Sequence, residues 1–177
     1  QHPYYDVDNM GFIKKSLIYL KSKKIDEVIF VAPSKKFTYY NLSNKSLVDN
    51  ADKLNLKINN NINLSLEDTN QVFQNKILKI FKNNKTTKGI ICGSDIKSLI
   101  LLSTLGYMGY QVNKDVYVIS KGIYSMPKYF YPKIPFFFED MEEAGSRLGE
   151  FLLKRINGEK IDKLQMIDKI KYFNQEK

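Results

Sequence analysis

The sequence has very few of the residues that most often perform chemistry. Its 177 residues include one cysteine, Cys92, and one histidine, His2. A single cysteine excludes an internal disulfide framework and suits a reducing compartment such as the cytoplasm. One histidine at the chain end makes a Ser-His-Asp or Cys-His arrangement unavailable, and no Cys/His cluster has the spacing of a metal site. Cys92 follows an apolar strand pattern and is expected to be an inert buried thiol. The sequence therefore predicts neither an enzyme nor a bound metal.

Glycine-rich phosphate loops and long apolar runs are also lacking. Neither the phosphate-loop pattern nor the dinucleotide glycine pattern occurs, so we expect no nucleotide cofactor. The longest apolar stretch, residues 96–108, is interrupted by polar residues and is too short to cross a bilayer. The chain opens with Gln1-His2-Pro3, without an initiator Met or a basic leader. No secretory signal is visible there, and we expect the parent protein to extend further upstream.

Positive charge, in contrast, is in excess. The net charge is +9, and arginine is represented only by Arg147 and Arg155. The lysines are scattered along the chain and do not gather beside base-reading Arg, Asn or Gln side chains. This pattern is typical of a solvated surface, so we expect no specific DNA binding by this chain itself.

The apolar residues follow a repeating order of helices and short strands. Buried strands are predicted at 28–32, 89–92 and 116–119, with a weaker strand region at 58–66. Helices are predicted for segments that begin near Asp8, Ser43, Asp68 and Asp95, where Asp68 and Asp95 are possible N-caps. This alternation predicts an α/β fold in which parallel strands are joined by right-handed helical crossovers.

Past Gly122 the order changes. An aromatic loop at 124–131 and an extended run at 134–138 precede a helix at 140–156, and 164–173 reads as one or two strands. The acidic residues at the start of that helix are explained by the helix dipole. A chain with this pattern leaves one sheet, contributes to another and returns.

Asp95 is the best candidate for a ligand contact. It follows the strand 89–92, and ligands of open α/β sheets bind beyond the carboxyl ends of the strands. A carboxylate there can accept hydrogen bonds from sugar hydroxyls or base nitrogens, although Asp95 can equally be only an N-cap. The loop 33–40 follows another strand end, and its aromatic residues Phe37, Tyr39 and Tyr40 can either stack on a ligand ring or cover the core.

The helix at 96–108 is apolar on nearly every side. One face can pack on the sheet, which leaves a second face for a partner or for burial within the same domain. We expect a homodimer through this helix, with Ile96, Leu99, Ile100 and Ser103 in the interface.

Several motifs together carry a family resemblance. Gly-Ile-Ile-Cys-Gly-Ser-Asp at 89–95, then an apolar helix, then Gly-Tyr-Gln-Val-Asn-Lys-Asp-Val-Tyr-Val-Ile-Ser at 109–120, follow one another at fixed spacing. From Asp8 onward the chain resembles the effector domain of LacI/GalR transcription repressors, a fold similar to that of periplasmic sugar-binding proteins. Residues 132–145 resemble the family's return segment, and 148–158 resemble the end of the helix that follows it.

The chain departs from the family at positions that grip the ligand. The usual Arg and the Gly three residues after it correspond to Ser43 and Ser46, a usual Asp corresponds to Gly122, and a usual Gln corresponds to Glu139. Asp95 alone keeps its usual type, so the ligand differs from an ordinary sugar or the site is vestigial. The resemblance implies a ligand site formed by the following residues: Phe37, Tyr40, Ser43, Asp95, Lys121, Gly122 and Glu139.

The resemblance also implies how the chain is organised. Residues of about 12–131 and 164–177 correspond to the C-terminal lobe, and about 132–160 to part of the N-terminal lobe, whose sheet edge would be exposed. The implied function is that of a cytoplasmic, dimeric sensor. It binds a small effector and acts on operator DNA only through a helix-turn-helix head that these residues do not include. The alternatives are a solute-binding protein of a sugar transport system, or an enzyme on a doubly wound fold, which would lack a nucleophile–base pair.

Overall fold

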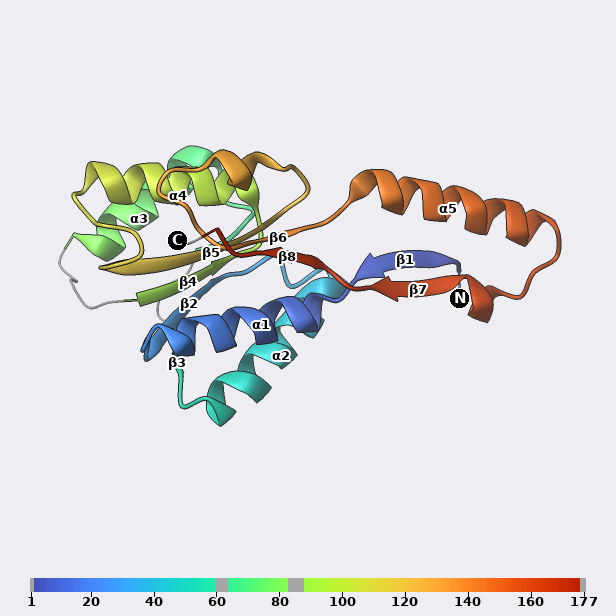
Figure 1. Ribbon diagram of the computed structural model, residues 1–177, viewed down its shortest axis with the longest axis horizontal. Helices are drawn as coiled ribbons and strands as arrows, with labels where there is room; N and C mark the ends of the chain where they lie inside the picture. The colour runs from blue at the N-terminus through green and yellow to red at the C-terminus, as the bar shows by residue number, and fades with distance from the viewer. Residues whose placement is uncertain (1, 60–63, 83–87, 176–177) are drawn as a thin grey trace.

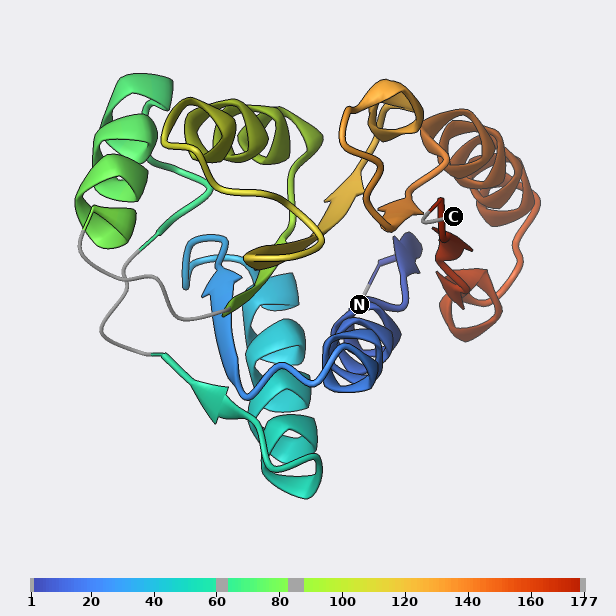
Figure 2. The same cartoon turned by 60° about the vertical axis from the view of Figure 1, so that its left-hand side comes forward.

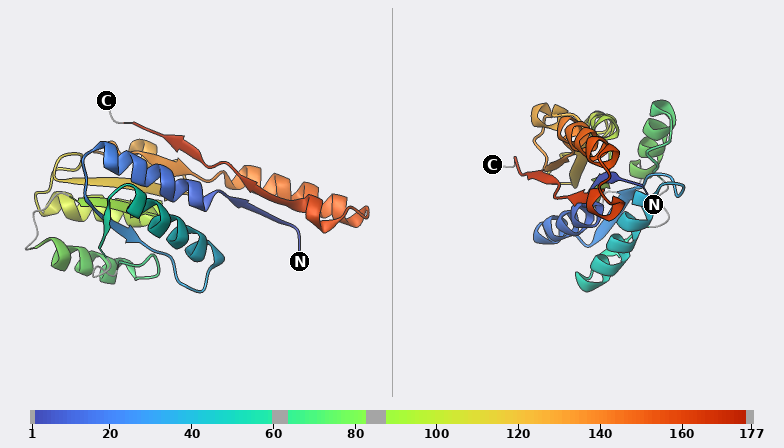
Figure 3. Two further views of the ribbon diagram at one scale, coloured as in Figure 1. Left: turned by 90° about the horizontal axis from the view of Figure 1, so that it is seen from below. Right: turned by 90° about the vertical axis from the view of Figure 1, so that its right-hand side faces the viewer.

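The protein has two lobes of unequal size. The computed structural model describes residues 2–59, 64–82 and 88–175. The large lobe is a six-stranded sheet with helices on both faces, and the small lobe is a two-stranded sheet with one helix against it (Figure 1). The small lobe extends from one end of the large lobe, which makes the molecule long, as seen from below in Figure 3. The predicted α/β class, with parallel strands flanked by helices, is confirmed.

The large sheet has the strand order β3-β2-β4-β5-β6-β8. Its strands are β2 (Glu27–Val31), β3 (Lys57–Ile58), β4 (Lys88–Cys92), β5 (Val116–Gly122), β6 (Phe136–Phe138) and β8 (Lys171–Phe173). All neighbours pair in parallel except β6 and β8. Every residue of β4 is buried, because this strand lies between β2 and β5 and is covered on both faces.

Two helices cover each face of the large sheet. Helices α1 (Asn9–Ser22) and α2 (Thr38–Lys53) lie on one face, and α3 (Asn70–Phe81) and α4 (Asp95–Tyr107) on the other (Figures 1 and 2). Alternate residues of β4 join different cores: Ile91 packs in the core of α1, and Ile90 in the core of α3 and α4. Gly89 allows the close approach of α1, since a Cβ atom there would lie 2.6 Å from Leu20 Cδ2.

The small lobe contains β1 (Tyr4–Val7), which pairs in parallel with β7 (Gln165–Asp168), and helix α5 (Met141–Ile156). Asp140 caps α5 by accepting a hydrogen bond from the Glu143 amide at 3.1 Å. Phe151 is the one buried residue within α5. The other large apolar side chains of this helix are exposed, so the small lobe has little core of its own within the described chain.

All five predicted helices are present, but both predicted caps were wrong. Asp8, which was not predicted as a cap, caps α1. The cap of α3 is Thr69 and not Asp68, which instead forms an ion pair with Lys76 at 2.7 Å. The cap of α4 is Ser94 and not Asp95. In both cases the cap is a neighbouring Thr or Ser residue. Its hydroxyl oxygen accepts a hydrogen bond from the backbone amide of the third residue of the helix. Helix α2 begins at Thr38, five positions before the predicted start.

The chain crosses between the lobes three times, at residues 7–9, 138–141 and 168–171, which we call the first, second and third crossovers (Figure 1). This differs from the expected division at 132 and 164. Strand β6 pairs with β5 in the large sheet because Phe136 and Phe137 are both 0% exposed there. Residues 165–168 pair with β1 in the small lobe.

The predicted strand region at 58–66 is only partly seen. Strand β3 ends at Ile58, and Ser65 forms an isolated bridge with Ala32, whereas residues 60–63 lie outside the described part of the chain. Within the described residues, no helix is long and apolar enough to span a membrane.

Candidate functional site

A cleft lies where the two lobes join. Its volume is about 260 Å³, and it is lined by Asp6, Asn9, Tyr39, Gly93, Lys121 and Glu139. Gly93 and Lys121 come from the carboxyl ends of β4 and β5, where an open α/β sheet places its ligand site. Asp6 comes directly before the first crossover, Asn9 is its last residue, and Glu139 lies in the second crossover. The cleft is therefore built from both lobes and from two of the segments that connect them.

Lys121 is the centre of the polar network in this cleft. Its ammonium group donates to Asn9 Oδ1 at 2.6 Å and forms an ion pair with Glu139 Oε1. It also lies over the rings of Phe12 and Tyr39, 5.6 and 5.9 Å from their centroids. Lys121 is 7% exposed, so its charge requires these partners. This arrangement places a cation beside an acidic side chain on the cleft wall.

Asp6 provides an acceptor on the other side of the cleft. Its Oδ1 atom accepts hydrogen bonds from the Val7 amide at 2.8 Å and from Asn9 Nδ2 at 3.3 Å. Asn9 Nδ2 also donates to the Val7 carbonyl at 3.1 Å, which fixes the amide orientation and turns Asn9 Oδ1 toward Lys121. Both of the hydrogen bonds that Asp6 accepts are made by Oδ1, and neither uses Oδ2.

Tyr39 supplies an aromatic face and a hydroxyl group. It lies in the first turn of α2, where Phe37 stacks on it with ring centroids 5.5 Å apart and an angle of 24° between the planes. Burial, together with the negative charges of Glu139 and Glu67, raises the pKa of Tyr39 above its ordinary value. The hydroxyl therefore stays protonated near neutral pH and can donate a hydrogen bond. Phe37 itself is 48% exposed and borders the site without lining it.

Asp95 lies outside this cleft, contrary to the expectation from the sequence. It is 4% exposed, and its two carboxylate oxygens accept from the Ile96 amide at 2.9 Å and the Tyr124 amide at 3.0 Å. It also packs on Gly122, where a Cβ atom would lie 2.6 Å from the Asp95 Cγ atom. Asp95 thus joins the start of α4 to the segment after β5, and Gly122 is the close neighbour that leaves room for it.

The remaining predicted contact residues are dispersed. Tyr40 lines a second hollow of about 500 Å³ that also includes Lys35 and the end of β2. Ser43 is 3% exposed on the inner side of α2 and lines neither hollow. Ser46 donates to the Met10 carbonyl at 2.8 Å and so joins α2 to α1. The sequence pattern thus identified Lys121 and Glu139 as cleft residues, but the structure separates them from Asp95, Tyr40 and Ser43.

Sequence reasoning missed Asp6 and Asn9. The resemblance begins only at Asp8, and neither residue follows a strand of the large sheet, so no strand-end signal marked them. Their spacing on either side of the helix cap Asp8 was the only available hint.

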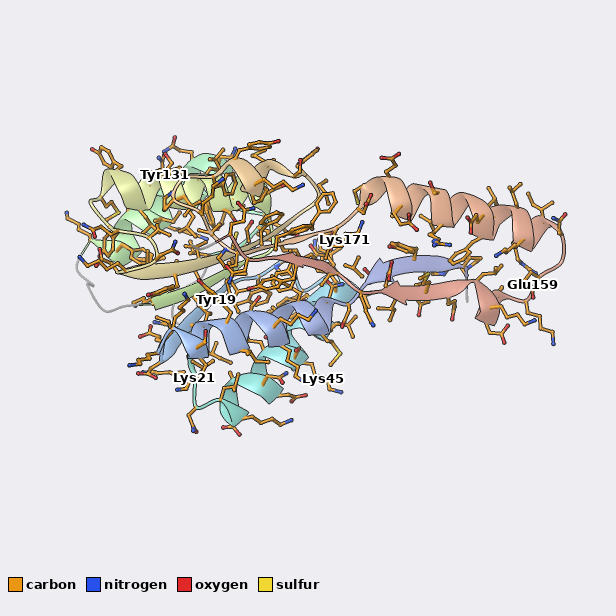
Figure 4. All side chains as sticks on the ribbon, viewed as in Figure 1. Tyr19, Lys21, Lys45, Tyr131, Glu159 and Lys171 are labelled. Carbon is orange, nitrogen blue, oxygen red and sulfur yellow. The ribbon has the colours of Figure 1, made fainter. Side chains whose placement is uncertain are left out.

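The expected dimer residues form an exposed strip on α4. Ile96 and Leu99 are 45% and 46% exposed, Ser103 is also exposed, and Ile100 is half-buried. Beside this strip is a groove of about 350 Å³ between α4 and the aromatic loop, lined by Leu99, Leu102, Ser103, Gly106, Tyr110, Val112, Phe130, Tyr131 and Pro132. Tyr131 is 93% exposed on this side of the large lobe (Figure 4). We call the strip and the groove the α4 surface.

The lobes, the crossovers and the cleft define a two-lobed α/β domain with a cleft between its lobes. The chain belongs to the periplasmic binding protein-like domain family, whose profile matches residues 17–168. No curated protein sequence matches the chain.

Several solved structures share this fold. A LacI family transcription regulator from Clostridium acetobutylicum superposes with a TM-score of 0.86 at 17% identity, covering 99% of this chain and 67% of that protein. The transcription regulator CcpA of Lactococcus lactis gives 0.83 at 17% identity, covering 97% and 63%. A periplasmic binding protein/LacI transcriptional regulator from Alkaliphilus metalliredigens QYMF, complexed with D-xylulofuranose, gives 0.76 at 21% identity, covering 96% and 63%. The chain therefore spans about two thirds or less of the length of each, and its resemblance to LacI-type regulators is confirmed at the level of the fold.

Proposed function

We propose that this chain is the ligand-sensing and dimer-forming part of a bacterial LacI/GalR-type transcriptional regulator. The ligand is a small polyhydroxylated molecule, a sugar or a related metabolite, that binds in the cleft between the lobes. The regulator acts in the cytoplasm on operator DNA through a DNA-binding head that is not among these 177 residues. The observation that carries the proposal is the cleft itself, which combines a free acceptor, a buried cation and an aromatic face.

The chemistry of the cleft supports a polyhydroxylated ligand. A hydroxyl group both donates and accepts, and the cleft offers a partner for each role. Asp6 Oδ2 accepts, whereas the Lys121 ammonium and the Tyr39 hydroxyl donate. The ring of Tyr39 can pack against the apolar face of a sugar ring. The usual gripping residues at 43, 95 and 122 are replaced or turned away, so Asp6, Asn9 and Lys121 take their place in this proposal.

The α4 surface supports the dimer and disfavours the solute-binding alternative. A soluble monomer seldom exposes a continuous apolar patch beside a groove without a partner for it. On α4 the exposed apolar residues follow helical spacing, from Ile96 through Leu99 toward Ser103, and the exposed Tyr107 and Tyr131 lie at its margin. Aromatic residues with few charges are typical of the centre of a protein interface.

A thermal-shift panel tests the ligand site. The probes are D-glucose, D-ribose, D-xylulose, maltose, cellobiose, adenosine and glucose 6-phosphate, and we expect at least one uncharged sugar to raise the melting temperature. Asp6→Asn should lower the affinity for that sugar by about 10- to 100-fold, since a charge-assisted hydrogen bond contributes roughly 1.5–3 kcal/mol. The matched control is Asp162→Asn, which removes the same charge from an exposed residue of the small lobe. A panel without any stabilising probe, or equal affinities for wild type and Asp6→Asn, would contradict the proposed site.

A further inference from the structure

Two of the three crossovers are held by one side chain of the large sheet. Lys121 lies near the end of β5, which is a rigid strand because it pairs with β4 on one side and β6 on the other. Its ammonium group reaches Asn9, the last residue of the first crossover, and Glu139 in the second. Asn9 is 3% exposed and the Lys121 side chain 9%, whereas the Glu139 side chain is 21% exposed. A buried amine therefore fixes both segments relative to the same strand.

The third crossover is held differently. The Asp168 carbonyl of the third crossover accepts a hydrogen bond from the Asp8 amide of the first crossover at 2.8 Å. This bond attaches the third crossover to the first. Lys171 also forms an ion pair with Asp140 at 2.8 Å, but this lysine side chain is 56% exposed (Figure 4). Exposed ion pairs contribute little to stability. The Glu139 amide of the second crossover also donates to the Gly122 carbonyl of β5 at 3.0 Å. Among the described residues, Lys121 is the buried side chain of the large sheet that contacts both the first and the second crossover.

Any change in the angle between the lobes has to occur in the crossovers. They are the only covalent connections between the lobes within the described chain, and each is three or four residues long. In two-lobed proteins, rotations between the lobes are absorbed by a small number of residues at the ends of helices and strands. Since Lys121 also lines the cleft, the group that restrains the crossovers is the group that a bound molecule would contact.

We propose that Lys121 couples occupancy of the cleft to the angle between the lobes. Without a bound molecule, its ammonium group holds Asn9 and Glu139 and so restrains the first two crossovers. A sugar oxygen that accepts a hydrogen bond from Lys121 competes with these two partners and changes that restraint. Lys121 is in this role a positioning residue, and the proposal deepens the sugar-binding function on which it rests.

Distance measurements between spin labels test the restraint without any ligand. Labels at Lys45→Cys in α2 and Lys154→Cys in α5 report on the two lobes, since both positions are exposed. The native Cys92 is 0% exposed and does not take up the label. We expect Lys121→Met to broaden the distance distribution by about twofold, because the ensemble gains orientations that the ammonium group excluded. Lys121→Arg, which keeps the cation, should restore the narrow distribution.

The matched control is Lys88→Met. Lys88 is also fully buried and forms an ion pair, with Glu27 at 3.2 Å, but it lies in the large sheet away from the crossovers. Its loss should lower stability and leave the interlobe distances unchanged. If Lys121→Met does not fold, the nearly isosteric Glu139→Gln removes only the charge pair and should broaden the distribution to a smaller extent.

The outcomes separate this proposal from the proposed function. Wild-type widths in both Lys121→Met and Glu139→Gln, or equal broadening by Lys88→Met, would overturn the coupling role whatever the thermal-shift panel shows. When the sugar with the largest shift in that panel is added, the mean distance should change in wild type and not in Lys121→Met. An unchanged wild-type distance with a bound sugar would leave sugar binding established and the coupling overturned.

Discussion

Asp95 has two different predicted roles, and replacing it separates them. The sequence pattern predicts a ligand contact, whereas the structure gives both of its carboxylate oxygens to backbone amides of Ile96 and Tyr124. It is 4% exposed and does not line the interlobe cleft. We therefore expect Asp95→Ala to lower stability and to leave sugar affinity unchanged.

The size of this effect follows from the groups that lose a partner. A buried amide left without an acceptor costs roughly 1–3 kcal/mol, and an acidic residue in the first turn of a helix contributes about 0.3–1 kcal/mol. Ile96 and Tyr124 are 45% and 54% exposed, so water can partly replace the lost acceptor at both amides. We expect the free energy of unfolding to fall by about 1–2 kcal/mol, the lower part of that range. For a chain of this size each kcal/mol shifts the melting temperature by roughly 2–4 °C, so the expected loss is about 2–8 °C.

Urea denaturation and the thermal-shift panel measure the two properties on the same variants. Asp95→Asn keeps one oxygen acceptor and should lose about half as much stability as Asp95→Ala. The reasoning is refuted if Asp95→Ala melts at the wild-type temperature while its sugar-dependent stabilisation disappears. That combination would mean that Asp95 contacts the ligand in solution and that its amide contacts contribute little.

Three further predictions concern packing, association and pH. Gly122→Ala should destabilise the fold by about 1–3 kcal/mol, because the new Cβ atom would overlap Asp95. Gly149→Ala in α5, where a Cβ atom would have nothing within 4 Å, should stabilise it by about 0.5–1 kcal/mol. Equal effects of the two substitutions in urea denaturation would contradict the close approach of Gly122 to Asp95. Leu99→Lys should convert a dimer into a monomer in light scattering without lowering the melting temperature of the monomer, and a monomeric wild type at tens of micromolar with an unaffected variant would argue against the α4 surface. Burial of Glu27 opposes its ionisation, but hydrogen bonds from Asn59 and Lys88 and the charge of Lys88 outweigh it and lower its pKa below 4.5. The ionised form therefore stabilises the fold above that pH and the contribution is lost on acidification through the lowered value, so Glu27→Gln should show a shallower acid transition than wild type; identical acid profiles would contradict this.

The sequence allowed much of the fold to be predicted because its apolar residues are concentrated in short runs. The strands around 28–32, 89–92 and 116–119 are each bounded by turn or cap residues. Such local patterns predict a strand without any knowledge of its tertiary contacts. The phenylalanine run at 136–138 was assigned to the wrong lobe. An extended apolar segment carries no information about which of two sheets it will join. Here Phe136 and Phe137 are 0% exposed in the large lobe, and this burial favours the large sheet.

The candidate site was predictable only in part. Lys121 was identified because it follows a predicted strand, and Glu139 because the family resemblance placed it where a ligand-gripping Gln usually stands. The two side chains do meet in the cleft. Asp95 was also at a strand end. However, Ser94 caps the helix, and the Asp95 carboxylate accepts a hydrogen bond from the Tyr124 amide and does not line the cleft. Asp6 and Asn9 come from the small lobe and the first crossover, and a strand-end rule for the large sheet gives no signal for them.

The sequence by itself determined the class of fold and, from Asp8 onward, most of the order of helices and strands, because both depend on residue type and local periodicity. Tertiary structure alone decided which polar groups share a cleft. Residues 6, 9, 121 and 139 are brought together by three chain crossings whose positions depend on the packing of both lobes. Which carboxylate stays free and which is used by backbone amides depends on neighbours distant in sequence, such as Tyr124 for Asp95 and Asn9 for Lys121.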